Sequence, residues 1–141
     1  MRILFLCTGN SCRSQMAEHF TRAMARTGQV KAASAGTDPV GVHPVAVQVM
    51  EEEGIEMSTA SSDALSDTDL DAFDLVITLC GDARDSCPIL PSGAKHLHWP
   101  LPDPAAAGGS PEQKLAAFRK VRDDIRSLLE DLLREPPGQN S

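Results

Sequence analysis

The N-terminal segment joins a short apolar run to a small, polar turn and then to a helical pattern. Ile3 to Leu6 are apolar, and the next eight residues, Cys7 to Ser14, read Cys-Thr-Gly-Asn-Ser-Cys-Arg-Ser. A strand that enters a glycine-containing turn and then a helix points backbone N–H groups and the positive helix end at one small volume. This pattern predicts an anion-binding loop with the Cys7 thiol at its base. Arg13 adds a guanidinium that can bind two oxygens at once.

The rest of the chain alternates strand-like and helical patterns. Ser14 is the expected N-cap of the first helix, and Ser110, Pro111 and Gln113 form a capping box before the last one. The expected strands cover residues 3–6, 30–33, 75–79 and 95–99, and the expected helices cover 14–26, 44–53 and 111–132. This order predicts an α/β, single-domain three-layer fold, with a central parallel four-stranded sheet and helices on both faces.

Length and charge limit the organisation and the partners of the chain. The 141 residues suit one domain over 1–134, and the polar, proline-containing residues 135–141 are expected to form a flexible tail. The net charge of -7 argues against nucleic acid and against an anionic membrane as partners. The first residues become polar too early for a signal peptide, and no apolar stretch is long enough to span a bilayer. We therefore expect a cytoplasmic protein.

Parallel sheets bind ligands at the carboxyl ends of their strands. Cys7 and Cys80 end two of the expected strands, and Asp103 lies in the loop after a third, so the three residues are expected to share one pocket. Each also has a simpler interpretation. A cysteine at a strand end is often a small buried apolar residue, and Asp103 could start a turn with Pro104.

The loop resembles that of the low-molecular-weight tyrosine phosphatase family, written Cys-x-Gly-Asn-x-Cys-Arg-Ser, and the Asp-Pro at 103–104 also matches. The resemblance implies a phosphatase-like fold, Cys7 as the nucleophile, Ser14 as a support for its thiolate and Asp103 as the general acid. It also implies an oxyanion site formed by residues of the loop, namely Thr8, Gly9, Asn10, Ser11, Cys12, Arg13 and Ser14.

Within that family the chain resembles the thioredoxin-coupled arsenate reductases. The segment Thr-Leu-Cys80-Gly-Asp-Ala-Arg-Asp-Ser-Cys87-Pro is similar to their double-cysteine segment. Gln15 replaces the proline that is usual in the phosphatases, alanines follow Pro104 where they usually place tyrosine, and the chain contains no tyrosine. The resemblance implies an enzyme for arsenic detoxification that reduces arsenate to arsenite, with phosphate or sulfate as competing oxyanions and thioredoxin as a partner.

The implied chemistry passes electrons through three thiols. Cys7 forms an adduct with arsenate, Cys80 attacks Cys7 to release arsenite, and Cys87 resolves the disulfide for thioredoxin. If 80–87 were helical, the Cα atoms of Cys80 and Cys87 would lie roughly 10 Å apart, whereas a disulfide tolerates about 7 Å. The segment is therefore expected to loop or to unwind on oxidation.

Several alternatives stay open at this stage. A phosphatase would need only Cys7, Arg13 and Asp103, a reductase fed by a small thiol would leave Cys87 dispensable, and a redox-responsive oxyanion-binding protein would not turn over. No cofactor is expected to be obligatory. Some relatives bind potassium beside the loop, and the residues at the matching positions all carry side-chain oxygens: Asn10, Glu18, Ser34 and Asp63.

Overall fold

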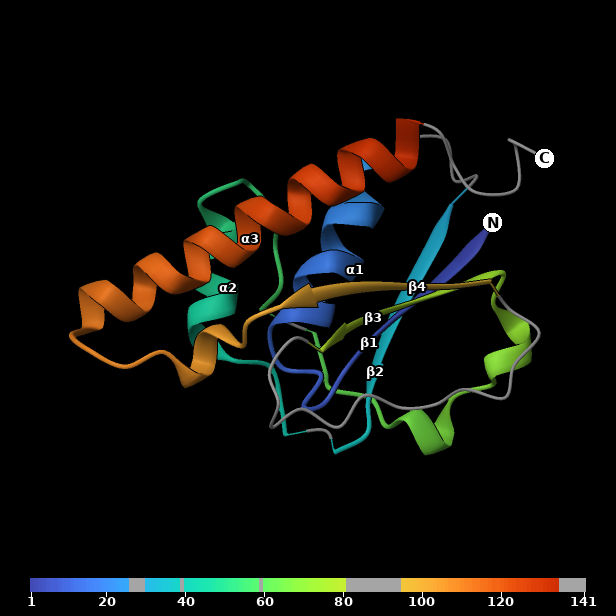
Figure 1. Cartoon of the computed structure of the whole chain (residues 1–141), viewed down its shortest axis with the longest axis horizontal. Coiled ribbons are helices and arrows are strands. Elements are labelled where there is room, and N and C mark those ends of the chain that lie inside the picture. Colours follow the sequence, from blue (N-terminus) through green and yellow to red (C-terminus); the bar gives the residue numbers. More distant parts are fainter. Residues whose placement is uncertain (26–29, 39, 59, 81–94, 135–141) are drawn as a thin grey trace.

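A four-stranded parallel sheet organises the chain. We describe a computed structural model for residues 1–25, 30–38, 40–58, 60–80 and 95–134. The strands are β1 (Arg2–Cys7), β2 (Lys31–Gly36), β3 (Leu75–Cys80) and β4 (Lys95–Leu101). Their order across the sheet is β2-β1-β3-β4, and every neighbouring pair is parallel (Figure 1). The predicted parallel four-stranded sheet is therefore confirmed.

The two faces of the sheet are covered differently. The three α-helices are α1 (Arg13–Met24), α2 (Pro44–Glu51) and α3 (Pro111–Arg134). All three contribute to one apolar core against the face that carries Ile3 and Phe5. Leu4 and Leu6 point to the other face, where the short 3-10 helices η1 (Leu65–Asp67) and η2 (Leu70–Ala72) pack (Figure 1). We expected helices on both faces. Among the described residues, the second face is covered by 3-10 turns rather than by a full α-helix.

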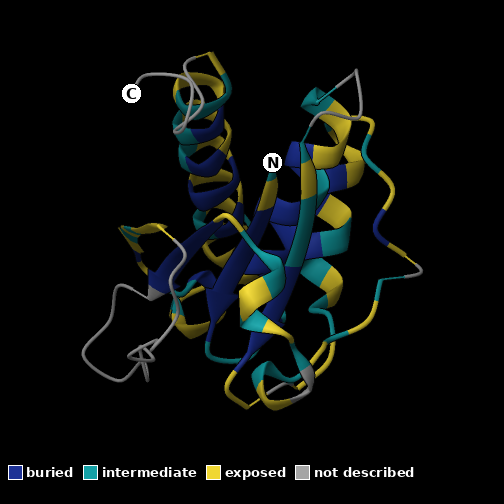
Figure 2. Cartoon of the chain, turned by 90° about the vertical axis from the view of Figure 1, so that its right-hand side faces the viewer, coloured by how far each residue is buried: buried dark blue, intermediate teal, exposed yellow. Residues whose placement is uncertain are grey.

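Burial follows from these layers. The central strands β1 and β3 are buried, whereas the edge strand β4 is mostly exposed or half-buried. Helix α3 alternates buried and exposed residues around its axis, as expected for a helix on the surface of a core (Figure 2). Its buried residues include Phe118, Val121 and Ile125, which belong to the predicted apolar stripe. None of the helices in the described ranges is both long and apolar enough to cross a membrane.

Helix ends show one confirmed and one wrong prediction. At α3, the Ser110 Oγ atom accepts from the Gln113 N–H at 3.2 Å, and Gln113 Oε1 accepts from the Ser110 N–H at 2.8 Å, which confirms the capping box. At α1 the N-cap is Cys12 rather than Ser14, and its side chain makes no capping hydrogen bond. Ser14 lies inside the first turn because its hydroxyl is engaged with the loop instead.

All four strands are longer than predicted, and β2 and β4 extend furthest at their carboxyl ends. The second strand runs from Lys31 to Gly36 rather than over 30–33, because it continues along β1 up to the pair Cys7–Gly36. β4 extends past Trp99 to Leu101, with an irregularity in its pairing to β3 between Thr78 and Cys80. Both extensions carry the sheet to the edge at which Cys7 lies.

Candidate active site

The nucleophile candidate lies at the carboxyl end of a central strand. Cys7 is the last residue of β1 and is buried. Its Sγ atom lies 2.9 Å from the hydroxyl oxygen of Ser14, which belongs to the first turn of α1. The strand, the loop and the helix therefore return to the same point, and the loop encloses the sulfur as the sequence predicted.

Asn10 holds the middle of the loop in a conformation that few residues adopt. Its φ is 45°, in the left-handed region, and its side chain is fully buried. The side-chain nitrogen donates to Ser14 Oγ at 2.7 Å, and Oδ1 accepts from the backbone N–H of Asp63 at 2.8 Å. Asn10 thus ties the loop both to the helix and to a segment about fifty residues later.

The connection between β2 and α2 forms backbone hydrogen bonds with the anion loop. Backbone N–H groups of Asp38 and His43 donate to carbonyls of the loop, to Thr8 at 2.9 Å and to Ser11 at 2.8 Å. Gly36 packs directly against the loop, because a Cβ atom built there would lie 2.6 Å from the Thr8 carbonyl oxygen and 2.8 Å from the Asn10 nitrogen. Only glycine fits this approach without displacing the loop.

Arg13 joins the loop to the ends of two strands. Its buried Nη1 atom donates to the carbonyl of Leu79 at 3.2 Å and to that of Leu101 at 3.0 Å. These carbonyls lie at the carboxyl ends of β3 and β4, next to Cys80 and shortly before Asp103. Arg13 therefore lies between the predicted catalytic elements, and its binding of an oxyanion stays a prediction.

The backbone of Cys80 lies close to that of Cys7. β1 and β3 are neighbours, and Leu6 pairs with Thr78, so Cys80 lies one residue beyond the position opposite Cys7. Neighbouring strands are about 4.8 Å apart and residues rise by about 3.3 Å, so the two Cα atoms are separated by roughly 6 Å. A disulfide spans up to about 7 Å. Cys87, the rest of the segment 81–94 and the tail 135–141 lie outside the described residues.

Asp103 reaches the loop through Cys12. Its Oδ1 atom accepts from the backbone N–H of Ala105 at 3.0 Å, and the Cys12 thiol lies 3.7 Å from the same oxygen. The predicted turn at Asp103-Pro104 and its predicted place beside the loop therefore both occur. Burial, together with the nearby Asp103 and Cys7, raises the pKa of Cys12 to about 12, so this thiol stays protonated at neutral pH.

The four residues expected at a potassium site form two hydrogen-bonded pairs. Ser34 donates to Glu18 at 2.6 Å, and the backbone of Asp63 contacts Asn10. The other oxygen of Glu18 pairs with Arg22 at 2.9 Å, which already places a positive charge beside this group. Among the described residues no three His, Cys, Asp or Glu side chains gather as a metal site. The side-chain oxygens of Asn10 and Glu18 thus accept from protein donors, and potassium binding stays a prediction.

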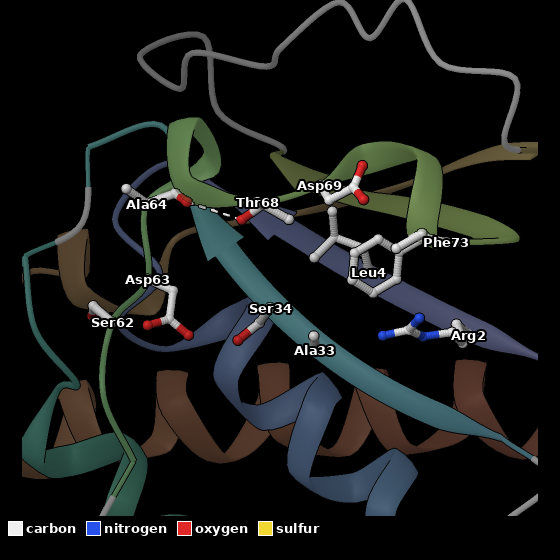
Figure 3. A pocket seen from close by; sticks show the side chains of 11 residues that line it. Arg2, Leu4, Ala33, Ser34, Ser62, Asp63, Ala64, Thr68, Asp69 and Phe73 are labelled. Carbon is white, nitrogen blue, oxygen red and sulfur yellow. Dashed lines mark hydrogen bonds between the residues drawn. The ribbon is translucent and has the colours of Figure 1, made fainter.

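A cavity of about 500 Å³ lies on the sheet face opposite the α-helices, away from Cys7. Ser34 and Asp63 line it with their side chains turned toward one another, and Arg2 lies beneath the ring of Phe73 at its other end (Figure 3). Neither Cys7 nor Asp103 lines this space. The cavity therefore adjoins the loop through the 62–63 segment and is distinct from the candidate active site.

Gln15 is a site residue whose role the sequence did not predict. In the sequence it is distinguished only by replacing the proline that is usual in the phosphatases. In the structure it is buried, and its Nε2 atom lies within hydrogen-bond distance of both Asn10 oxygens and of the Ser61 carbonyl. The glutamine in place of proline directly after the loop was the only sequence signal for this role, because its partner Ser61 lies in a distant polar segment.

Comparisons with known proteins agree with this geometry. The family model described as low molecular weight phosphotyrosine protein phosphatase matches residues 2–139. The chain is 47% identical over 129 residues to an arsenate reductase of Bacillus subtilis (strain 168), covering 92% of each chain. A solved structure titled "An arsenate reductase in the phosphate binding state" matches with a TM-score of 0.79 and 34% identity, covering 95% of this chain and 97% of that one.

A second solved structure is the thioredoxin-dependent arsenate reductase of Corynebacterium glutamicum. It matches with a TM-score of 0.66 and 29% identity over 94% of this chain, which spans 62% of that longer protein. The parallel sheet, the loop after β1 and the match over nearly the full length agree. The chain belongs to the low molecular weight phosphotyrosine protein phosphatase family.

Proposed function

We propose that this chain is an arsenate reductase that passes electrons from thioredoxin through an internal relay of three cysteines. The observation that carries the proposal is the adjacency of β1 and β3, which brings the backbones of Cys7 and Cys80 together at the edge where the anion loop lies. The reductase names of relatives similar over almost the whole chain support it.

The first step uses the loop. A tetrahedral oxyanion binds to the backbone N–H groups of residues 8–14 and to the Arg13 guanidinium. The Cys7 thiolate attacks arsenic, and one arsenate oxygen leaves as water with a proton supplied by Asp103. The product is a covalent thiol adduct in which arsenic is still pentavalent. Phosphate and sulfate have the same shape and charge type, so we expect them to compete at this step.

The second step moves two electrons. Cys80, as a thiolate, attacks the sulfur of Cys7 and forms a Cys7–Cys80 disulfide, while the electron pair of the sulfur–arsenic bond passes to arsenic and releases arsenite. Cys87 then attacks Cys80, forms a Cys80–Cys87 disulfide and frees the Cys7 thiolate. A thioredoxin dithiol reduces that last disulfide by exchange. Two thiols are oxidised for each arsenate reduced, so the electrons balance.

Phosphatase activity is the competing function, because it would use the same first step with a phosphate ester. The chain has no tyrosine, and alanines occupy 105–107 after Asp103-Pro104. An aromatic side chain at those positions would stack on a phenyl ring, and alanine cannot. A small inorganic oxyanion needs no such platform, so this composition favours arsenate.

Mass mapping of disulfides after one turnover tests the proposal. The reduced protein is mixed with arsenate without external reductant, quenched and digested. We expect one arsenite per protein and a Cys80–Cys87 disulfide. Cys87→Ser should stop at Cys7–Cys80, and Cys80→Ser should release no arsenite. Release of arsenite by Cys80→Ser would contradict the relay. So would an unmodified chain that reduces no arsenate while Cys80→Ser hydrolyses aryl phosphates efficiently.

A further inference from the structure

Gln15 connects the anion loop to a distant part of the chain through one side-chain amide. Its Nε2 atom lies 3.2 Å from the Asn10 carbonyl oxygen, 3.0 Å from Asn10 Oδ1 and 2.9 Å from the carbonyl oxygen of Ser61. All three partners are acceptors, and the amide nitrogen can only donate. The buried amide therefore acts as a single donor group that joins two segments of the site.

The direction of the Asn10 amide is fixed by its donors. Oδ1 accepts from the backbone N–H of Asp63 at 2.8 Å as well as from Gln15. A backbone N–H can only donate, so the oxygen faces that side and the nitrogen faces Ser14, at 2.7 Å from its Oγ. Ser14 must then accept from Asn10, which directs its own hydroxyl hydrogen toward the Cys7 sulfur at 2.9 Å.

We propose that Gln15 is a positioning residue for the nucleophile, because its amide, together with the Asp63 N–H, holds the direction of a hydrogen-bond chain from Asn10 through Ser14 to the sulfur of Cys7. A donor that faces the sulfur stabilises the thiolate relative to the thiol. The same contacts hold Asn10 at its positive φ, which orients the loop around the oxyanion. This inference rests on the proposed role of Cys7 as the nucleophile.

Gln15 lies in the third position of α1, where a proline would be tolerated. Proline could provide neither the side-chain donor nor the backbone N–H. Glutamate would have the same shape but would turn carboxylate oxygens toward three acceptor oxygens. Methionine would keep most of the volume and the helical preference while removing the donor.

The first test compares Gln15→Met with the control Gln48→Met, which alters an exposed glutamine of α2. Both proteins are alkylated with iodoacetamide across a pH series, and the rate at Cys7 is read by peptide mass mapping. For Gln15→Met we expect the midpoint of the Cys7 profile to rise by about half a pH unit, with kcat/KM for arsenate roughly three- to tenfold lower. The control should match the unmodified protein.

The second test uses Gln15→Glu, whose defect should depend on pH. The ratio of its kcat/KM to that of the unmodified protein is measured at each pH, so that titrations common to both cancel. We expect the ratio to be lowest at alkaline pH and to rise on acidification, because the protonated carboxyl regains one donor. The ratio for Gln15→Met should not rise on acidification, because methionine regains no donor at any pH.

These readouts separate the inference from the proposed function. Alkylation of Cys7, and calorimetric binding of inorganic phosphate, need no arsenate turnover, so they test Gln15 even if the relay is wrong. An unshifted Cys7 profile in folded Gln15→Met would overturn the positioning role. So would a pH-independent ratio for Gln15→Glu. Circular dichroism and thermal unfolding of each variant establish that the folded protein is compared.

Discussion

The thiol of Cys12 lies 3.7 Å from Oδ1 of Asp103, so the anion loop and the loop after β4 meet through a sulfur and a carboxylate. The two residues are 91 positions apart in the chain. Their contact places the proposed general acid at the rim of the loop. It also gives Cys12 a distinct property, because a buried thiol beside a carboxylate resists ionisation.

Ionisation of Cys12 should make the fold sensitive to alkali. Its pKa is raised from 9.0 to about 12, so the stability that depends on its protonated state is fully present below pH 9. That stability is lost as the pH rises from 9 toward 12, because the unfolded chain ionises first. We expect urea unfolding to show a fall in unfolding free energy over this window, and a smaller fall in Cys12→Ala. Equal slopes in the two proteins would contradict this assignment.

Acid should weaken the contact between α2 and α3. Glu52 accepts hydrogen bonds from Arg119 and Arg122, which lower its pKa from 4.5 to about 2. The stabilising contribution is present above pH 4.5 and is lost as the pH falls toward 2. We expect Glu52→Gln to unfold at lower temperature at pH 7 and to differ less from the unmodified protein near pH 2. Calorimetry at several pH values measures this, with Glu112→Gln in the first turn of α3 as a control.

Asp103 should affect chemistry more than binding. Asp103→Asn keeps an oxygen for the Ala105 N–H but cannot supply a proton, so kcat for arsenate should fall by roughly 10²- to 10⁴-fold. The dissociation constant of inorganic phosphate, measured by calorimetry, should change little. If turnover were retained, the interpretation of Asp103 as a turn residue alone would be correct.

Gly36 should be intolerant of the smallest side chain. A Cβ atom there would contact the carbonyl of Thr8 and the nitrogen of Asn10 at distances that require the loop to move. We expect Gly36→Ala to lose about 1–3 kcal/mol of unfolding free energy and most of its phosphate affinity. Gly108→Ala is the matched control, because no atom lies within 4 Å of a Cβ built at that glycine. Equal phosphate binding in both variants would show that the loop adapts.

Much of this architecture could be predicted from local patterns. Ile3 to Leu6 is a continuous apolar run, and Leu75 to Leu79 is apolar except for Thr78, which is typical of strands covered on both faces. Ser110 to Gln113 is a capping box. The meeting of Cys7, Cys80 and the Asp103 loop at one edge follows from the geometry of parallel sheets. These features depend on neighbours in sequence or on general topology.

Other features depended on distant contacts and could not be predicted. Ser14 is a residue type typical of an N-cap, but its hydroxyl is engaged by both Asn10 and Cys7, and α1 begins at Arg13. The hydrogen bonds of Gln15 include one to the carbonyl of Ser61, which lies in a polar segment without a periodic pattern. The bonds from Arg13 to two strand ends likewise appear only when the sheet has formed.

The sheet order has a consequence for how the enzyme fails. β1 and β3 are neighbours although about seventy residues separate them in the chain. The two thiols proposed for electron transfer, Cys7 and Cys80, are therefore close together only while β1 and β3 remain paired. Partially unfolded molecules should therefore react productively with neither arsenate nor thioredoxin. The rate of arsenite formation should decline in parallel with the cooperative unfolding of the domain.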